Sequence, residues 1–387
     1  MGISIARELK ERYADCSVTM IEKENSCALH ASGRNSGVLH AGFYYTADSL
    51  KARFTRDGNR ELTQYCEERR IPINKCGKLV VAQSDRDHAL MDELLERGRR
   101  NGVDLLSISA QEAREIEPRV RTTDRAIFSS TTSSVDPLVV VHSLERDAKR
   151  SGVEMRYGVS YLGRHGKDIV TTAGMFHHGY LVNAAGLYAD KVAQGFGFSK
   201  EYEILPFKGL YLYSEEPRGA IRTNIYPVPD LRNPFLGVHF TVTVDGHAKI
   251  GPTAIPAFWR EQYRGGDNFH LSEFLDITRR QLGLLSSSGF GFMKLAFGEL
   301  RKYSRSRMVS LAGALMRGIS KEDYRKWGKP GIRAQLVNIK ERRLEMDFVI
   351  EGDARSLHIL NAVSPGFTCC LPFSRFVCDT IAKKANR

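Results

Sequence analysis

Long apolar runs are absent from this sequence of 387 residues. No stretch approaches the roughly 20 consecutive apolar residues that a helix needs to cross a bilayer, and no secretory signal pattern is visible. Hydrophobic residues still make up 42% of the chain, which is enough for a large core and two domains. We therefore expect a cytoplasmic protein, or one held peripherally on the inner face of the cell membrane, or a mitochondrial one if its source is eukaryotic.

Paired cysteines and metal-binding patterns are also missing. The seven cysteines include no C-x-x-C pair, and Cys369 and Cys370 are adjacent, which disfavours a bond between them. We expect reduced thiols in a reducing compartment. Without an H-x-x-x-H spacing or a carboxylate cluster, we expect no metal site, and the lack of a nucleophile elbow argues against a serine hydrolase.

Acidic residues are fewer than basic ones. The chain has 45 Asp and Glu against 57 Lys and Arg, a formal net charge of +12. Such a surface can bind nucleic acid, anionic lipid or acidic substrates, or it can simply be solvated. Because no nucleic-acid-binding motif accompanies the charge, we expect a dicarboxylate substrate or a peripheral membrane contact, and no nucleic acid.

The first 22 residues are typical of the second half of a Rossmann βαβ unit. Residues 3–9 place apolar side chains on one helical face, residues 18–21 read as a short buried strand, and Glu22 follows. An acid about twenty positions beyond the glycine turn bonds a ribose hydroxyl in such units. The first strand and most of the G-x-G-x-x-G loop are missing, since only Gly2 could be its last glycine. We expect a late start codon or a fragment; the alternative is a chain that truly lacks the strand.

Two helix starts are marked further along the chain. Ser109 with Glu112 three positions later forms a capping-box pattern. Asp136 is a good N-cap before Pro137, which suits the first helical turn. The apolar spacing after it predicts a buried face made of Leu138, Val141 and Leu144.

Short blocks of sequence in a fixed order carry a family resemblance. They are 35–45 (NSGVLHAGFYY), 76–79 (CGKL), 183–188 (NAAGLY), 205–209 (LPFKG), 224–230 (NIYPVPD), 234–241 (PFLGVHFT), 331–335 (GIRAQ) and 361–366 (NAVSPG). Together they resemble the FAD-dependent oxidoreductases of the D-amino-acid-oxidase superfamily, and in particular their L-2-hydroxyglutarate dehydrogenase branch. NIYPVPD with PFLGVHFT is the specific part, whereas NAAG is shared by many flavoproteins.

The resemblance implies a mixed α/β (α+β) fold with a Rossmann-like FAD-binding domain and a second, antiparallel-sheet domain for the substrate. Alternating short β runs and Pro or Gly turns over 210–256 suit such a sheet as one wall of a pocket. We assign 1–78, 135–207 and 331–387 to the FAD-binding domain, and 79–134 and 208–330 to the substrate-binding domain.

The resemblance also implies a set of FAD contacts. Small residues after a strand let backbone approach a cofactor closely, and a turn into the last helix can place N–H groups near the flavin. Tight packing of strand on helix would explain each alanine equally well. The residues carried over are Gly2, Glu22, Lys23, Ser32, Asn35, Ser36, Gly37, Val159, Ala184, Ala185, Gly186, Ser364, Pro365, Gly366 and Thr368.

Oxidation of a 2-hydroxy acid needs a flavin facing the Cα–H bond, a base for the hydroxyl proton and cations for the carboxylates. Arg333 is the first carboxylate candidate, because a planar guanidinium binds a carboxylate through two bonds. Lys208 and Tyr226 are weaker candidates for holding substrate oxygens. His239 and His40 compete as the base, and each would be read as structural without the family blocks.

We expect oxidation of L-2-hydroxyglutarate to 2-oxoglutarate, with hydride passing to FAD and electrons then passing to a quinone or another acceptor. Two alternatives stay open. One is amino-acid or glycerol-3-phosphate oxidation within the same superfamily, and the other is a flavin-free homologue without activity.

Residues 290–307 combine aromatic and basic side chains. A helix of this composition can lie on a membrane surface. It can equally pack on the substrate domain and keep its charged ends in water.

Overall fold

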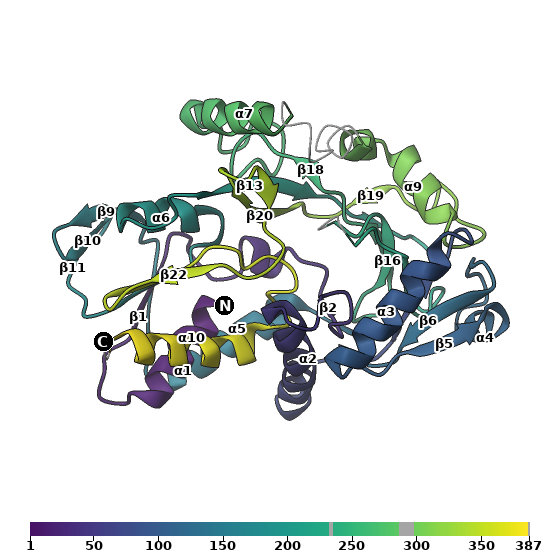
Figure 1. The fold of residues 1–387 in the computed structure, drawn as a ribbon, viewed down its shortest axis with the longest axis horizontal. Coiled ribbons are helices and arrows are strands. Elements are labelled where there is room, and N and C mark those ends of the chain that lie inside the picture. The colour runs from purple at the N-terminus through teal and green to yellow at the C-terminus, as the bar shows by residue number, and fades with distance from the viewer. Residues whose placement is uncertain (232–234, 286–297, 386–387) are drawn as a thin grey trace.

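The computed structural model describes residues 1–231, 235–285 and 298–385 (Figure 1). Its 3-10 helices are η1 (Ala31–Gly33), η2 (Gly186–Tyr188) and η3 (Arg301–Tyr303). Its α-helices are α1 (Gly2–Arg12), α2 (Leu50–Glu68), α3 (Asp87–Asn101), α4 (Ala110–Ile116), α5 (Pro137–Arg150), α6 (Ala189–Gly195), α7 (Leu271–Leu285), α9 (Arg305–Gly313) and α10 (Cys370–Ala385).

The smaller sheets are formed by strands from residues 19–183 and 350–359. The parallel pair is β1 (Thr19–Glu22) and β8 (Glu154–Tyr157). Three sheets have three strands each: β12 (Leu181–Asn183), β23 (Ser356–Ile359) and β22 (Ile350–Gly352); β2 (Val38–Leu39), β7 (Ser133–Val135) and β3 (Ile73–Asn74); β11 (Gly174–Phe176), β10 (Asp168–Thr171) and β9 (Tyr161–His165).

Two larger sheets make up the other part of the molecule. The eight-stranded one runs β19 (Lys326–Trp327), β14 (Leu212–Tyr213), β17 (Ala248–Gly251), β16 (His239–Val242), β15 (Asn224–Pro227), β4 (Lys78–Val81), β6 (Arg125–Ser129) and β5 (Leu106–Ser109). The four-stranded one runs β18 (Ile255–Pro256), β13 (Tyr202–Gly209), β20 (Gly331–Asn338) and β21 (Arg343–Leu344).

The expected helix, strand and acid form at the N-terminus. α1 buries Ile5 and Ala6 and packs on α5 and α10, while β1 runs parallel to β8 and ends at Glu22. In Figure 1 these three helices lie together beneath β22. Helices packed on short parallel strands make this the Rossmann-like part of the fold.

Both predicted helix starts are confirmed, and of the predicted buried face of α5 Val141 and Leu144 are confirmed while Leu138 is wrong. Ser109 and Glu112 form both bonds of the capping box, and the Asp136 carboxylate accepts the backbone N–H of Leu138 at the start of α5. Leu138 is 37% exposed, whereas Val140 is fully buried. The first turn of α5 therefore faces solvent on the Leu138 side, because the buried stripe begins at Val140.

The eight-stranded sheet has a core on each face. Alternate residues of β4 point to opposite faces, so Leu79 and Val81 pack with α9, while Val80 packs with Met91 of α3. All its pairings are antiparallel except that of β15 with β4. The expected antiparallel sheet over 210–256 and the mixed α/β fold class are confirmed, and the assignment of residue ranges to two domains stays a prediction.

None of the helices in the described ranges is both long and apolar enough to cross a membrane. Of the aromatic and basic run, residues 290–297 lie outside the described residues. In the described remainder, 298–307, Glu299 is buried while Leu300 and Tyr303 are exposed, and Met308 and Val309, which follow the run in α9, are buried against the large sheet. The described part of the run is thus mostly exposed, and its membrane contact stays a prediction.

Candidate active site

Basic side chains from distant parts of the sequence gather where β4, β16 and β20 approach the segment between β2 and α2. Burial lowers the pKa of His40 well below its usual value, and the nearby charges of Lys78, His239 and Arg333 lower it further. Burial is likewise the main reason that the pKa of His239 falls to about 3. Two neutral imidazoles therefore lie within electrostatic reach of a lysine and an arginine.

His239 is held in one tautomer. Its Nδ1 lies 2.9 Å from the carbonyl oxygen of Gly237, and because a carbonyl can only accept, Nδ1 carries the proton. The ring stacks on Tyr226 with centroids 3.7 Å apart and planes 20° from parallel. Its Nε2 consequently keeps a lone pair, which is the form that a general base needs.

His40 is positioned by its backbone. Its N–H donates to the Thr368 hydroxyl oxygen at 3.2 Å, and that hydroxyl donates to the carbonyl of Val38 at 3.3 Å. Thr368, predicted as a cofactor contact, thus joins the N-terminal end of α10 to the strand that precedes His40. His40 is half-buried, whereas His239 is only 4% exposed.

Lys78 belongs to the same cluster, and our sequence reasoning missed it. Its side chain is completely buried, and its Nζ has no hydrogen-bond partner among the described residues. The ammonium lies 4.7–4.8 Å from the ring centroids of Phe43, Tyr44 and Tyr226, and burial lowers its pKa to about 7. The sequence did contain one signal for this burial, because Lys78 directly precedes the apolar residues 79–82.

Arg333 and Lys208 lie on opposite faces of their sheet. Arg333 of β20 is paired with Phe207 of β13, and Lys208 is paired with Ile332; neighbouring residues of a strand point to opposite sides. Arg333 is half-buried, its guanidinium lies 5.0 Å from the Phe235 ring centroid, and burial lowers its pKa. Of the predicted substrate contacts, Arg333 and Tyr226 therefore join the histidines, and Lys208 faces away.

Lys51 of α2 adds a further buried cation near Arg333. Burial lowers the pKa of Lys51 to about 8, while the carboxylate of Asp347 opposes this effect. The Asp347 carboxylate is itself engaged, since it accepts the backbone N–H groups of Leu50 and Lys51. The cluster is thus richer in cations than in free carboxylates, which suits an anionic ligand.

The residues predicted to hold FAD offer suitable donors and space. Glu22 is half-buried at the end of β1, and its Oε1 accepts the N–H of Glu24 at 3.1 Å. Gly2 begins α1, which has no side-chain cap, so its first N–H groups can meet an anion. A Cβ built on Gly186 would meet nothing within 4 Å, and Ala185 beside it is exposed. A dinucleotide fits these groups, because the Glu22 carboxylate can accept hydrogen bonds from ribose hydroxyls and the N–H groups at the start of α1 can bind phosphate.

The segment after β1 folds largely on itself. Lys23 places its Nζ 2.6 Å from Glu24 and 2.7 Å from Glu261. The Asn35 amide donates to the carbonyl of Ser32 at 2.7 Å, and its oxygen accepts the N–H of Gly37 at 2.9 Å. Lys23 and Asn35 therefore have a structural role in fixing the conformation of this segment.

Gly37 and its neighbours have structural reasons of their own. A Cβ on Gly37 would lie 2.3 Å from the carbonyl oxygen of Val135, and its φ is +79°. Ser36 accepts the N–H of Val38 at 3.3 Å. Glycine is therefore required here by packing alone.

The remaining predicted cofactor residues lie at the ends of β8 and β12 and in the turn before α10. The N–H of Val159 donates to the Glu22 carbonyl at 3.0 Å, so a backbone contact of Val159 with a cofactor would have to use its carbonyl. Ala184 follows β12 and is half-buried. Ser364 is exposed, while Pro365 and Gly366 are buried at the turn before α10.

A Rossmann-like half with an acid at the end of its strand, joined to a sheet in which the neutral His239 lies among cations, fits an FAD-dependent oxidoreductase. A family model described as "DAO: FAD dependent oxidoreductase" matches residues 1–374, and the chain belongs to this family. Its cofactor is accordingly FAD, and the family expected from the sequence blocks is confirmed.

Curated relatives match nearly the whole chain. It is 35% identical to the mitochondrial L-2-hydroxyglutarate dehydrogenase of Nematostella vectensis, over 99% of this chain and 89% of that protein. It is 34% identical to the L-2-hydroxyglutarate dehydrogenase of Escherichia coli strain K12, over 98% of this chain and 90% of the other. The human mitochondrial L-2-hydroxyglutarate dehydrogenase is 33% identical, over 99% and 87%.

Solved structures share the fold at low identity. L-alpha-glycerophosphate oxidase from Mycoplasma pneumoniae, with FAD bound, superposes with a TM-score of 0.76 at 19% identity, covering 98% of this chain and 92% of that one. Glycine oxidase from Geobacillus kaustophilus gives 0.74 at 18% identity, covering 99% and 92%. These likenesses establish the fold class expected from the sequence.

Proposed function

We propose that this protein oxidises L-2-hydroxyglutarate to 2-oxoglutarate and passes the C2 hydride to FAD. The observation that carries the proposal is the cluster in which two neutral histidines, His40 and His239, lie beside the cations Lys78 and Arg333. Relatives named L-2-hydroxyglutarate dehydrogenase over almost the whole chain support the choice of substrate.

The substrate carries two carboxylates, which need two separated cationic anchors. Arg333 is the anchor that can bind a carboxylate through two parallel bonds. Lys78 supplies the second charge, since its Nζ has no hydrogen-bond partner among the described residues. Tyr226 packs between Lys78 and His239 and keeps their spacing, and Lys208 would act on the other face of its sheet.

The base takes the hydroxyl proton as hydride leaves C2. Nε2 of His239 is our first choice, because the bond from Nδ1 to Gly237 leaves this nitrogen unprotonated. His40 is the alternative, since it is neutral and more accessible. FAD, when bound, accepts the hydride; the protein's part is to orient C2 and to remove the proton.

FAD would be held by the residues at the ends of the short strands. In this proposal the Glu22 carboxylate binds ribose hydroxyls, and the start of α1 at Gly2 faces the pyrophosphate. The small residues Ala184 and Ala185, with Gly186, leave room for the cofactor beside β12. The turn at 364–368 would approach the flavin ring.

The test is anaerobic reduction of the FAD-loaded protein. L-2-hydroxyglutarate should bleach the flavin absorbance, and the D isomer should hardly do so, because the base and the anchors fix one face of C2. Bleaching by amino acids or glycerol 3-phosphate but not by L-2-hydroxyglutarate would assign a neighbouring activity instead. Re-oxidation by a quinone analogue, faster with anionic vesicles present, would support a quinone acceptor and a peripheral membrane contact.

Replacing Lys78 by Met should separate stability from function. We expect kcat/KM to fall about 10- to 100-fold, since a charge-assisted bond contributes about 1.5–3 kcal/mol. The melting temperature should rise, because a buried ammonium without a partner is destabilising. That rise should shrink as pH increases from about 7 to about 10.4: the unfolded lysine binds a proton over this range and the folded one does not, so wild-type stability increases.

Lys249→Met is the matched control for this substitution. Lys249 is also a buried lysine beside tyrosine rings, in β17, with its pKa lowered to about 8 by burial. It is not among the charges that lower the pKa of His40, but like Lys78 it lowers the pKa of His239, so the two variants share the effect on His239 and differ in the proposed substrate contact. If Lys78→Met kept full activity, or both variants lost it equally, a specific substrate contact at Lys78 would be excluded.

A further inference from the structure

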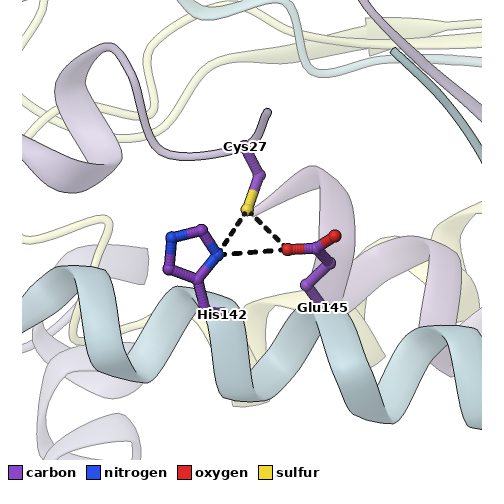
Figure 2. A group of neighbouring side chains, drawn as sticks. All are labelled: Cys27, His142 and Glu145. Atoms are coloured by element: carbon purple, nitrogen blue, oxygen red, sulfur yellow. Dashed lines mark hydrogen bonds and ion pairs between the residues drawn. The ribbon is translucent and has the colours of Figure 1, made fainter. Parts of the chain in front are cut away.

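Cys27, His142 and Glu145 form a compact cluster away from the proposed active site (Figure 2). Cys27 lies in the segment that follows β1, and the other two lie three positions apart on α5. The Cys27 Sγ is 3.4 Å from Nδ1 of His142 and 3.0 Å from Oε2 of Glu145, and the latter two atoms are 3.2 Å apart. A thiol sulfur, an imidazole nitrogen and a carboxylate oxygen thus all lie next to one another.

This geometry differs from that of a nucleophilic cysteine. In a Cys–His–acid triad the thiol and the acid contact opposite nitrogens of the imidazole, so that one proton can be relayed across the ring. Here Sγ and the carboxylate oxygen both approach the same nitrogen, Nδ1. A shared ring nitrogen argues against a triad and for atoms that surround a common centre.

We propose that Cys27, His142 and Glu145 bind a zinc ion through Sγ, Nδ1 and Oε2, with an open fourth position. Zinc bonds of about 2.0–2.3 Å in a tetrahedron place ligand atoms about 3.3–3.8 Å apart. The three separations in the cluster are 3.0–3.4 Å. Small outward movements of the side chains therefore suffice to admit the ion.

The chemistry of the ligands selects the metal. A thiolate, an imidazole and a carboxylate together favour zinc over magnesium or calcium, which prefer oxygen ligands alone. The thiolate and the carboxylate carry two negative charges, which balance the charge of Zn²⁺. His142 has a side chain that is 43% exposed, so the open position can be filled by water.

Two hydrogen bonds already orient the Glu145 carboxylate. The other oxygen of Glu145, Oε1, accepts the Tyr157 hydroxyl at 2.6 Å and the Lys149 ammonium at 2.5 Å. Such outer contacts fix a metal-binding carboxylate and tune its affinity. They leave Oε2 directed towards Cys27 and His142, as Figure 2 shows for the three side chains.

A comparable cluster elsewhere is less suited to a cation. Glu24, His30 and Glu261 also lie close together. However, the Lys23 ammonium is 2.6 Å from Glu24 and 2.7 Å from Glu261, so one cation already pairs with both carboxylates. The Cys27 cluster is the better candidate because Lys149 pairs with Oε1 of Glu145 and leaves Oε2, the oxygen beside Cys27 and His142, for a metal ion.

Zinc would join the segment after β1 to α5. That segment runs from Glu22, our proposed ribose contact, to η1, and α5 is a rigid element with an N-cap and a proline in its first turn.

The experiment is zinc titration of the metal-stripped full-length protein, followed by calorimetry and by melting temperature. We expect one zinc per chain and a higher melting temperature with zinc. Cobalt in place of zinc should give a thiolate charge-transfer absorption in the near ultraviolet. Cys27→Ala should weaken binding more than about 100-fold, beyond the loss typical of an outer contact, while Tyr157→Phe should weaken it about 10- to 100-fold.

Cys16→Ala is the control, because Cys16 is an exposed cysteine outside the cluster. It should bind zinc as the wild type does. Circular dichroism checks that each variant is folded, and Cys27→Ser, which keeps the size of the side chain, should still lose the cobalt–thiolate absorption. Absence of zinc binding in the wild type, or equal binding by Cys27→Ala, would overturn the site and leave a hydrogen-bonded thiol.

Discussion

Replacing His239 by Asn should lower kcat about 10²- to 10⁴-fold and change KM little, because a general base contributes to the transition state and not to ground-state binding. Nε2 of His239 is the nitrogen left without a proton by the Nδ1 bond to Gly237. Steady-state kinetics with L-2-hydroxyglutarate and an artificial electron acceptor would measure both constants.

The pH dependence gives a second measurement of the same base. Burial lowers the pKa of His239 to about 3 in the free protein. A base is active when it is deprotonated, so His239 should cause no fall of the wild-type kcat/KM as pH decreases through about 6.5, where an ordinary histidine becomes charged; Lys78, whose pKa is about 7, gains its charge over this range and should raise kcat/KM. A bound dianion favours the protonated imidazole, and the acid limb of kcat should therefore lie at higher pH than that of kcat/KM.

His40→Asn and His88→Asn complete this experiment. His88 lies outside the histidine and cation cluster and bonds the Thr123 carbonyl, so its loss should leave both constants unchanged. His40→Asn should lower kcat less than His239→Asn does. A larger loss of kcat in His40→Asn than in His239→Asn would move the role of base to His40.

Replacing Arg333 by Met should raise KM about 10- to 100-fold with a smaller change in kcat. A charge-assisted bond contributes about 1.5–3 kcal/mol, and methionine fills similar volume without the charge. Arg333→Lys should recover only part of the affinity, because an ammonium cannot bind a carboxylate through two parallel bonds. Substrate titration of each FAD-loaded variant would measure the change.

Lys208→Met is the informative comparison for Arg333. Lys208 is one residue away from the strand partner of Arg333, and it points to the other face of the sheet. The substitution Lys208→Met should raise KM much less than Arg333→Met does. Equal effects of the two substitutions would show that the substrate contacts both faces, and a fall in kcat alone for Arg333→Met would contradict its role as an anchor.

Local patterns predicted the local structure well. The capping box at Ser109, the N-cap at Asp136 and the strand before Glu22 all formed, because each depends on residues within one turn or one short strand. The prediction for Leu138 was wrong, although it followed the same apolar spacing. Which side of a first helical turn is covered depends on the neighbouring element and not on the helix itself.

The candidate site was predicted only in part. Family blocks pointed to His40, His239 and Arg333, and the structure brings these three together. They could not show that Lys78 is buried among three aromatic rings, since a lysine at a strand end is usually solvated. Nor could spacing indicate the Cys27 cluster, whose cysteine and histidine are 115 positions apart.

The sequence by itself determined the family, the cofactor and several of the helices and strands, because these rest on contiguous blocks and on side-chain periodicity. Only the tertiary structure decided which cations share a space with the histidines, which tautomer His239 adopts, and that Lys208 faces away from Arg333. Strand register fixes these relations, and a shift of one residue would reverse every side chain between the two faces of a sheet. Register is set by pairing between distant segments, which no local pattern records.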